Sequence, residues 1–187
     1  MSIVYATLSQ ALAERLRAGG ATFAAREVSG FELAGGRVQR VATDQGPVET
    51  DAVVIAAGAH SNALSSKLGS EVPLETERGY HVMLASPSVQ PRIPTASGEG
   101  KYFATPMEGG LRIAGAVEFA GLAASPNYDR ADVLLEGAKR LFPGLAHGSV
   151  ERWMGHRPSL PDSKPVIGRS PRARNAYFAF GHGHVGL

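Results

Sequence analysis

The sequence contains no cysteine among its 187 residues. This absence excludes disulfides, thiolate catalysis and zinc or iron–sulfur sites built on cysteine. No apolar run approaches the roughly 20 residues that span a bilayer, and the N-terminus lacks the basic-then-apolar layout of a signal peptide. We therefore expect a protein of the reducing cytoplasm, with no integral membrane segment.

The sequence also lacks a large excess of positive or negative charge. The formal net charge is +2, and the densest basic group, "GRSPRARN" (168–175), lies in a proline-containing segment typical of a solvated face. Nucleic acid is therefore not an expected partner. The sequence has no H-E-x-x-H, G-x-S-x-G or P-loop pattern and no carboxylates at metal-ligand spacing. We expect neither a metal site nor hydrolase or nucleotide triphosphatase activity.

The chain does have 23 glycines and a hydrophobic content of 43%, enough for one sizeable core or two small lobes. Val4, Leu8, Leu12 and Leu16 recur every four residues and predict an opening helix that stops at Gly19. Three strands are expected next, at 26–33, 37–44 and 50–58, joined as an antiparallel meander. A short helix then covers 61–69.

The second half has a similar mixture of elements. We expect a strand at 78–84, a hairpin of 101–107 with 111–119, a helix over 130–143, a loop over 155–168 and a final strand at 176–180. The fold class is therefore α+β, or α/β-like with two lobes. The predicted divisions are a first lobe (1–70), a second lobe (71–150) and a return to the first lobe (151–187).

Two segments carry candidate binding features. The apolar strand in "DAVVIAAGAHS" (51–61) ends in small residues, which let a flat or anionic group approach the backbone, or alternatively let another element cross. In "GHRPSLPDSKPVIG" (155–168), Arg157 sits on a proline-stiffened segment and suits bidentate capture of a carboxylate. The alternative for Arg157 is an internal ion pair with Asp162 or Glu151.

The aromatic and imidazole candidates are weaker. Tyr102 and Phe103 alternate on a strand, so one faces inward and packs in a core or lines a pocket. His182 and His184 are two residues apart and can point to the same side. The terminal Gly181, Gly183 and Gly186 spell G-x-G-x-x-G, yet no helix or ribose-binding acid follows them in the sequence.

The order of the segments resembles an FAD-dependent amino acid oxidoreductase of the D-amino acid oxidase and glycine oxidase type, especially a D-amino acid dehydrogenase-like protein. The resemblance covers about the C-terminal two-thirds of such an enzyme. It implies part of an FAD-binding domain plus an antiparallel-sheet substrate domain, with the N-terminal Rossmann strand missing. The segments concerned are "DAVVIAAGAHS", "ERGYHVML", "KYFATPMEGGLRIAGAVEFAG", "MGHRPSLPDSKPVIG" and "AYFAFGHGHVGL".

For the cofactor, the resemblance implies that Val28 meets the adenine of FAD and that Ala57 and Gly58 end a strand that passes it. The terminal glycines then let the backbone approach the isoalloxazine ring, and their match to the dinucleotide fingerprint is a coincidence. The residues implied for that approach are Gly181, His182, Gly183, Val185 and Gly186. Because the nucleotide-binding fingerprint of the family lies outside this sequence, we expect the chain alone to bind FAD weakly or not at all.

For the substrate, the resemblance implies that Arg157 clamps the α-carboxylate. It also implies His184 and Tyr102 as further catalytic-site residues, with Phe103 as the alternative to Tyr102. The implied reaction oxidises the α-C–N bond of an amino acid by hydride transfer to flavin. Oxygen and a membrane quinone stay open as electron acceptors, and the location is cytoplasmic or peripheral to the inner membrane. An unpaired strand edge predicts a tendency to form homodimers. The alternative is an inactive, FAD-free ligand-binding domain.

Overall fold

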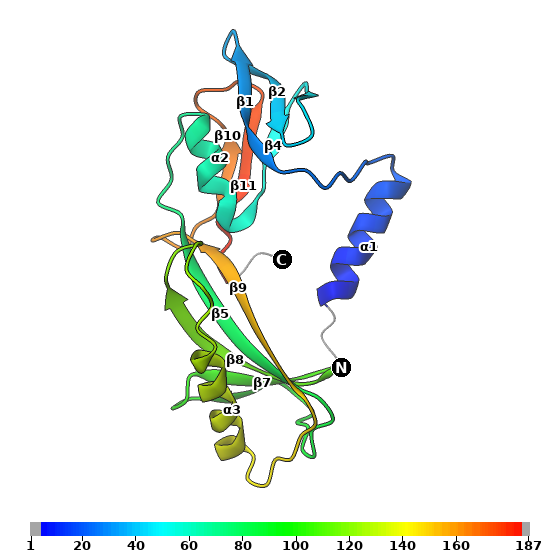
Figure 1. Cartoon of the computed structure of the whole chain (residues 1–187), viewed down its shortest axis with the longest axis vertical. Helices are drawn as coiled ribbons and strands as arrows, with labels where there is room; N and C mark the ends of the chain where they lie inside the picture. The colour runs from blue at the N-terminus through cyan, green and yellow to red at the C-terminus, as the bar shows by residue number, and fades with distance from the viewer. Residues whose placement is uncertain (1–4, 185–187) are drawn as a thin grey trace. The chain divides into compact units, whose positions relative to one another are not determined.

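The computed structural model of the protein describes residues 5–184. The chain divides into two compact units. Figure 1 labels their helices and strands. The first unit comprises the N-terminal residues through Phe23, Arg78–Glu118 and Ala124–Gly155. The second unit comprises Ala24–Glu77, Phe119–Ala123 and the residues from His156 onward. Each unit has its own hydrophobic core.

The opening helix is confirmed as α1 (Tyr5–Ala18). Leu8, Leu12 and Leu16 of the predicted apolar stripe are all exposed, and Val4 lies outside the described residues. The sequence pattern thus predicts the helix correctly, and that stripe is not buried by the described residues.

The second unit begins with a three-stranded antiparallel sheet of β1 (Val28–Ala34), β2 (Arg37–Thr43) and β3 (Val48–Glu49). Gly35 and Gly36 connect β1 to β2 with φ of 56° and 72°. Positive φ at both central residues is typical of a two-residue hairpin turn whose backbone twist matches that of the flanking strands. Glycine adopts these φ values without strain. The antiparallel connection between the first two strands of the predicted meander is confirmed.

The predicted meander is wrong at its third strand. β4 (Val53–Ile55) leaves β2 and pairs in parallel with β11 (Ala176–Phe180), which is also antiparallel to β10 (Val166–Arg169). The buried Asn175 amide explains this choice: its Oδ1 accepts from Val38 N (2.9 Å), and its Nδ2 donates to Val38 O and Asp51 O (2.8 Å each). A side chain more than 120 residues away in sequence thus directs β4 to β11.

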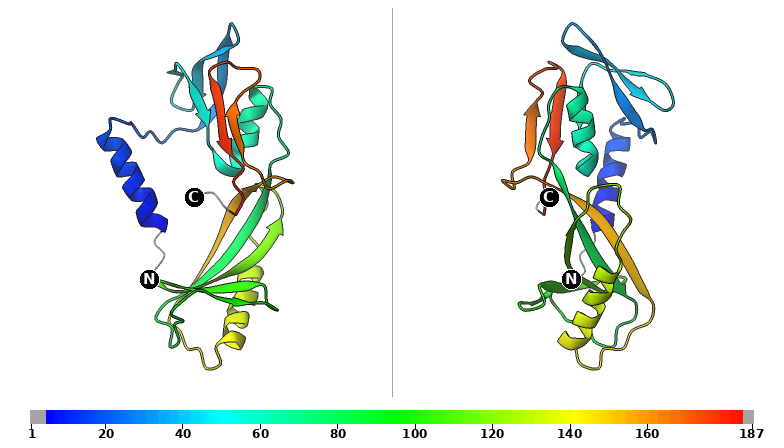
Figure 2. Two further views of the ribbon diagram at one scale, coloured as in Figure 1. Left: turned by 180° about the vertical axis from the view of Figure 1, so that it is seen from behind. Right: turned by 60° about the vertical axis from the view of Figure 1, so that its left-hand side comes forward.

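β4 is covered on one face only. Ile55 is buried, but Val54 is 60% exposed, so only one face of this strand packs in the core of the second unit. After β4, the 3-10 turn η1 (Gly58–His60) leads into α2 (Ser61–Lys67). In both views of Figure 2, α2 lies beside the sheet of β4, β10 and β11.

A five-stranded sheet has the order β6-β7-β8-β5-β9. Its strands are β5 (Glu75–Leu84), β6 (Thr95–Ser97), β7 (Tyr102–Met107), β8 (Gly110–Phe119) and β9 (Val150–Ser159). The predicted hairpin is confirmed, with β7 and β8 antiparallel and Met107 opposite Gly110. The predicted loop over 155–168 is wrong, because β9 continues through Arg157 to Ser159 and β10 begins at Val166.

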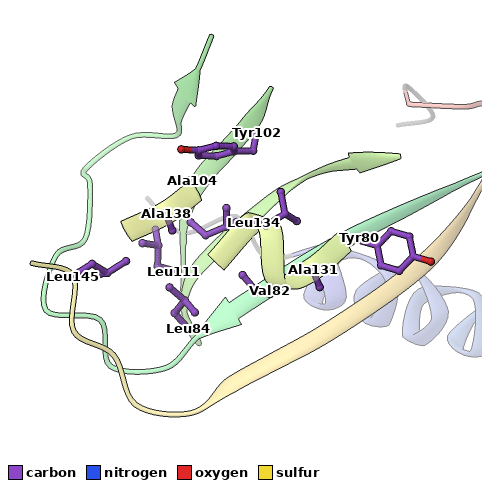
Figure 3. Close-up of a cluster of buried hydrophobic side chains, with 11 residues drawn as sticks. Tyr80, Val82, Leu84, Tyr102, Ala104, Leu111, Ala131, Leu134, Ala138 and Leu145 are labelled. Carbon is purple, nitrogen blue, oxygen red and sulfur yellow. The ribbon is translucent and has the colours of Figure 1, made fainter. Parts of the chain in front are cut away.

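Helix α3 (Asp129–Leu141) packs against the strands of the first unit and completes its core. Figure 3 shows Leu134 and Ala138 of α3 facing strand residues such as Leu111. Leu134 and Ala138 of α3 are buried, whereas Val133 is exposed.

The buried guanidinium of Arg78 contacts several segments of the first unit. The Arg78 side chain is only 1% exposed, and its Nη1 lies 3.4 Å from Glu118 Oε2. The same guanidinium donates hydrogen bonds to the carbonyl oxygens of Ala124 and of Ser125, the latter at 3.1 Å. A charge this deeply buried is tolerated only when it is paired and hydrogen-bonded.

Glu118 is the centre of the network. The Tyr80 hydroxyl donates to Glu118 Oε2 at 2.6 Å, and Arg130 Nε lies 3.1 Å from Oε1. The hydrogen bond from Tyr80, with those from Arg130 and Arg78, holds the pKa of Glu118 below its ordinary value, against the opposing effect of desolvation. The carboxylate therefore stays ionised and paired at neutral pH.

Candidate functional site

An apolar cavity of about 280 Å³ lies in the second unit and includes two residues predicted to meet a cofactor. Val28 begins β1 and Ala57 follows β4, so strand ends from two different sheets meet in this wall. The complete lining is Val28, Phe31, Val41, Val53, Val54, Ile55, Ala56, Ala57 and Leu64. A wall of this composition can accept the flat, apolar face of a ligand.

Gly58, the third predicted residue of this region, begins the turn η1. Its φ is +55°, and a Cβ placed there would meet nothing within 4 Å. The glycine is therefore required by the backbone conformation rather than by crowding.

A second pocket, of about 120 Å³, lies in the same unit where the last strand ends. It brings together four of the residues predicted from the terminal motif, namely Gly181, His182, Gly183 and His184, with a group of residues that the sequence did not single out: Glu77, Ser159, Leu160 and Ser163. Val185 and Gly186, also predicted, lie outside the described residues. We refer to this cavity as the terminal pocket.

The glycines shape the wall of the terminal pocket. Gly181 and Gly183 have φ of 82° and 57°, and a Cβ at Gly181 would lie 2.6 Å from Leu160 Cδ1. Gly183 N donates to the carbonyl of Pro158 at 2.8 Å, which fixes the segment against β9. The backbone therefore lines the pocket here with little side chain in the way, and any larger residue at 181 would distort it.

Arg157 and Ser159 each carry a buried polar atom without a hydrogen-bond partner among the described residues: Arg157 Nη1 and Ser159 Oγ. The two residues are two apart on β9, so their side chains leave the strand on the same face. Leaving such a group unsatisfied costs about 1–3 kcal/mol. An arrangement with two orphaned polar groups is typical of a site that a polar ligand completes.

The alternative role of Arg157, an internal ion pair, has no support in the described part of the chain. No Asp or Glu there forms an ion pair with Arg157. Its neighbour His156 points elsewhere and places Nδ1 2.8 Å from Thr76 Oγ1. Arg157 thus keeps hydrogen-bonding capacity for a ligand.

Glu77 and His184 face each other across the terminal pocket. His184 Nδ1 lies 3.6 Å from Glu77 Oε2, and the two side chains are 60% and 21% exposed. The sequence predicts His184 as a site residue but gives no sign of Glu77, because its partner is more than 100 residues away and no local pattern marks it.

Tyr102 lies in the core of the first unit. It is 5% exposed, and its hydroxyl donates to the carbonyl of Gly137 in α3 at 2.7 Å. Figure 3 shows its ring among the core side chains beside Ala104. Tyr102 is therefore the inward-facing, core-packing member of the pair with Phe103, which is exposed, and we do not include it in the proposed site.

An aromatic stack lies on the first unit. The rings of His81 and Trp153 are 4.8 Å apart with an interplanar angle of 26°. A Cβ at Gly155 would lie 1.9 Å from the Trp153 ring, so this glycine makes room for the indole. Burial, assisted by the nearby Arg112 charge, lowers the pKa of His81 to about 4.

This stack predicts an acid transition in tryptophan fluorescence. Trp153 is the only tryptophan, and a protonated imidazole stacked on an indole quenches its emission. Emission should hold steady from pH 7 to about pH 5 and fall around pH 4, as His81 protonates. Since the unfolded imidazole titrates near 6.5, the unfolded state binds more protons between these values, and the free energy of unfolding should decrease as pH falls through that window.

The variant His81→Gln serves as the control and should abolish the transition near pH 4. A fluorescence midpoint near the ordinary histidine value of about 6.5 would contradict the stacked, desolvated position of His81.

The described residues contain neither a candidate metal site nor a helix that could span a membrane. Residues 5–184 contain no group of three or more His, Asp or Glu side chains placed to hold a metal ion. Within the same range, no helix has both the length and the apolar character that crossing a membrane requires.

Comparison with known proteins decides the family. The sequence profile described as "FAD dependent oxidoreductase" matches residues 3–187. The chain belongs to this family. It is 42% identical over 181 residues to a D-amino-acid oxidase from Bradyrhizobium diazoefficiens and 36% identical over 162 residues to D-amino acid dehydrogenase 2 from Mesorhizobium japonicum.

Those matches cover 95% and 85% of the chain, but only 43% and 39% of the two relatives. The chain therefore spans less than half the length of these curated relatives of the FAD-dependent oxidoreductase family, not the two-thirds that the resemblance implies.

Solved structures agree with the fold. An iminodiacetate oxidase from Chelativorans sp. BNC1 aligns with a TM-score of 0.79 at 20% identity, covering 94% of this chain and 48% of that one. A glycine oxidase from Geobacillus kaustophilus aligns with a TM-score of 0.75 at 24% identity, covering 86% and 44%. At these identities the likeness shows the fold alone.

The residues fit the cofactor of the FAD-dependent oxidoreductase family in two respects. The apolar cavity at Val28 and Ala57 offers a wall for an apolar part of FAD. Gly181 and Gly183, on either side of His182, have a left-handed backbone and no side chain, so a flat ring can approach the main chain closely at these two positions.

Proposed function

We propose that this chain forms the substrate-binding and flavin-facing part of an FAD-dependent oxidoreductase that oxidises the α-C–N bond of D-amino acids. The observation that carries the proposal is the Arg157 guanidinium, which has a buried Nη1 without a partner among the described residues. The names of the relatives with 42% and 36% identity, a D-amino-acid oxidase and a D-amino acid dehydrogenase, support this choice of substrate class.

In this proposal Arg157 binds the α-carboxylate of the substrate. Its planar guanidinium can donate two parallel hydrogen bonds, which fixes the orientation of the carboxylate as well as its position. Fixing the carboxylate restricts where Cα can lie, and such positioning can supply much of the rate acceleration in a hydride transfer. The neighbouring Ser159 hydroxyl, also buried and unpartnered, completes the polar side of the site.

FAD, when bound, supplies the acceptor for the hydride that leaves Cα. Val28, Ala57 and Gly58 are proposed to hold the cofactor at the apolar cavity, and the backbone from Gly181 to Gly183 to hold its ring system. Glycines at 181 and 183 keep side chains out of that contact. Leu160, which packs against Gly181, helps to exclude water from the pocket.

A turnover assay with paired products tests the proposed function. The flavin-loaded protein that carries this sequence should convert D-alanine to its 2-oxo acid and ammonia in equal amounts, and anaerobic mixing with D-alanine should bleach the flavin absorbance. L-alanine serves as the matched control and should react far more slowly. Binding of D-alanine without bleaching would instead favour the alternative, a ligand-binding domain without catalysis.

A further inference from the structure

The charged side chain in the lining of the terminal pocket is acidic. Among the described residues that line it, Glu77 is the one acidic side chain, and no lysine or arginine is present. The other polar groups are the hydroxyls of Ser159 and Ser163 and the imidazoles of His182 and His184. A pocket with this lining attracts a cationic group rather than a second carboxylate.

The Glu77 carboxylate is also incompletely satisfied. Its side chain is 21% exposed, and its partner among the described residues is His184, at 3.6 Å. That separation exceeds the 2.7–2.9 Å of a good charge-assisted hydrogen bond. An ionised carboxylate can accept about four hydrogen bonds, so Glu77 retains capacity for a donor that comes closer than the imidazole does.

The strand β9 links this carboxylate to the proposed carboxylate-binding residue. Ser159 lines the same pocket as Glu77, and Arg157 lies two residues earlier on the same face of the strand. The unpartnered Ser159 Oγ thus shares a pocket with Glu77, an acceptor for ammonium groups, and a strand face with Arg157, a donor for carboxylates. An α-amino acid in its zwitterionic form carries these two charges on one carbon.

We propose that Glu77 binds the α-ammonium group of the substrate whose carboxylate Arg157 binds. This inference rests on the proposed function and names a residue for the amine. The ammonium group donates to the Glu77 carboxylate in place of the distant His184 contact, and the Ser159 hydroxyl completes the hydrogen bonds of the same ligand. The pocket then selects amino acids over carboxylic acids that lack the amine.

A pair of ligands that differ only in the amine tests this assignment. The flavin-loaded protein that carries this sequence is first reduced, so that the flavin cannot accept a hydride and D-alanine binds without reacting. Anaerobic calorimetry then measures the dissociation constants of D-alanine and propionate for the wild type, Glu77→Gln and Arg157→Met. Glu75→Gln, an exposed glutamate on the same strand outside the pocket, is the matched control.

Glu77→Gln should weaken D-alanine binding by about 10- to 100-fold, the range expected for losing a hydrogen bond to a charged group, and leave propionate binding unchanged or tighter. Arg157→Met should weaken both ligands, and Glu75→Gln neither. The inference is overturned if Glu77→Gln leaves D-alanine binding intact or weakens both ligands equally. Propionate binding also verifies that the variant site is folded.

The same experiment separates this inference from the proposed function beneath it. If the wild type binds neither ligand, or if Arg157→Met changes neither dissociation constant, the proposed function fails and the role of Glu77 with it. If Arg157→Met acts as expected and Glu77→Gln does not discriminate, only the role of Glu77 is refuted.

Discussion

The variant Arg157→Met should lose most of the apparent affinity for D-amino acids in the flavin-loaded protein. Removing one partner of a buried, hydrogen-bonded charge pair costs about 2–5 kcal/mol, which corresponds to a rise of roughly 30- to several-thousand-fold in the Michaelis constant. The methionine keeps the length of the side chain and its apolar packing but removes all donors. Steady-state kinetics with D-alanine measure the change.

Two further variants make this result specific. Arg157→Lys keeps the charge but not the bidentate geometry, so it should recover only part of the loss. Arg169→Met removes an exposed arginine of β10 and should leave the Michaelis constant unchanged. A near-normal Michaelis constant in Arg157→Met would refute the carboxylate-binding role.

The variant Arg78→Met should strongly destabilise the first unit. Arg78 is fully buried, pairs with Glu118 and donates to two main-chain carbonyls. Breaking a buried pair by removing one partner costs about 3–5 kcal/mol, because the remaining groups stay buried without their partner. Urea unfolding followed by emission of Trp153, which lies in the same unit, measures the loss.

Arg152→Met provides the matched control for this measurement, because Arg152 also lies in the first unit. Arg152 pairs with a carboxylate as well, that of Asp132, but both side chains are 46% exposed. Exposed pairs contribute little to stability, so this variant should unfold at nearly the wild-type urea concentration. Equal effects of the two variants would show that burial of Arg78 does not govern its contribution.

Local patterns predict most helices and strands of this fold. The strand at 176–180 matches β11 residue for residue, and Gly35 with Gly36 marks the first hairpin turn. These elements depend on short-range features, namely an apolar run bounded by turn residues and two adjacent glycines.

The missed elements depend on partners distant in sequence. β4 joins β11 because Asn175 bonds to the backbone at Val38 and Asp51, and no local feature of the apolar run at 53–56 carries that information. A glycine and three prolines predict a loop at and after Arg157, yet the ladder of the five-stranded sheet extends through Arg157. In both places, pairing with strands distant in sequence decides the structure, and the local sequence preference does not.

Some residues of the candidate site can likewise be predicted from local sequence, and others cannot. The terminal glycines are visible in the sequence, because left-handed backbone requires them. Glu77 and Ser159 are not visible, because their significance comes from burial and from a pocket that three separate segments build. Tyr102, which the structure buries in the core of the first unit, is ambiguous in the sequence, since a strand aromatic that suits a ligand pocket equally suits a core.

A crystal structure of the flavin-loaded protein with a bound carboxylate ligand such as propionate tests the central claim most directly. We expect the ligand carboxylate to accept hydrogen bonds from the Arg157 guanidinium, and the backbone of residues 181–183 to run along the flavin ring. A ligand carboxylate bound elsewhere, with Arg157 paired to an acidic side chain of the protein, would contradict it.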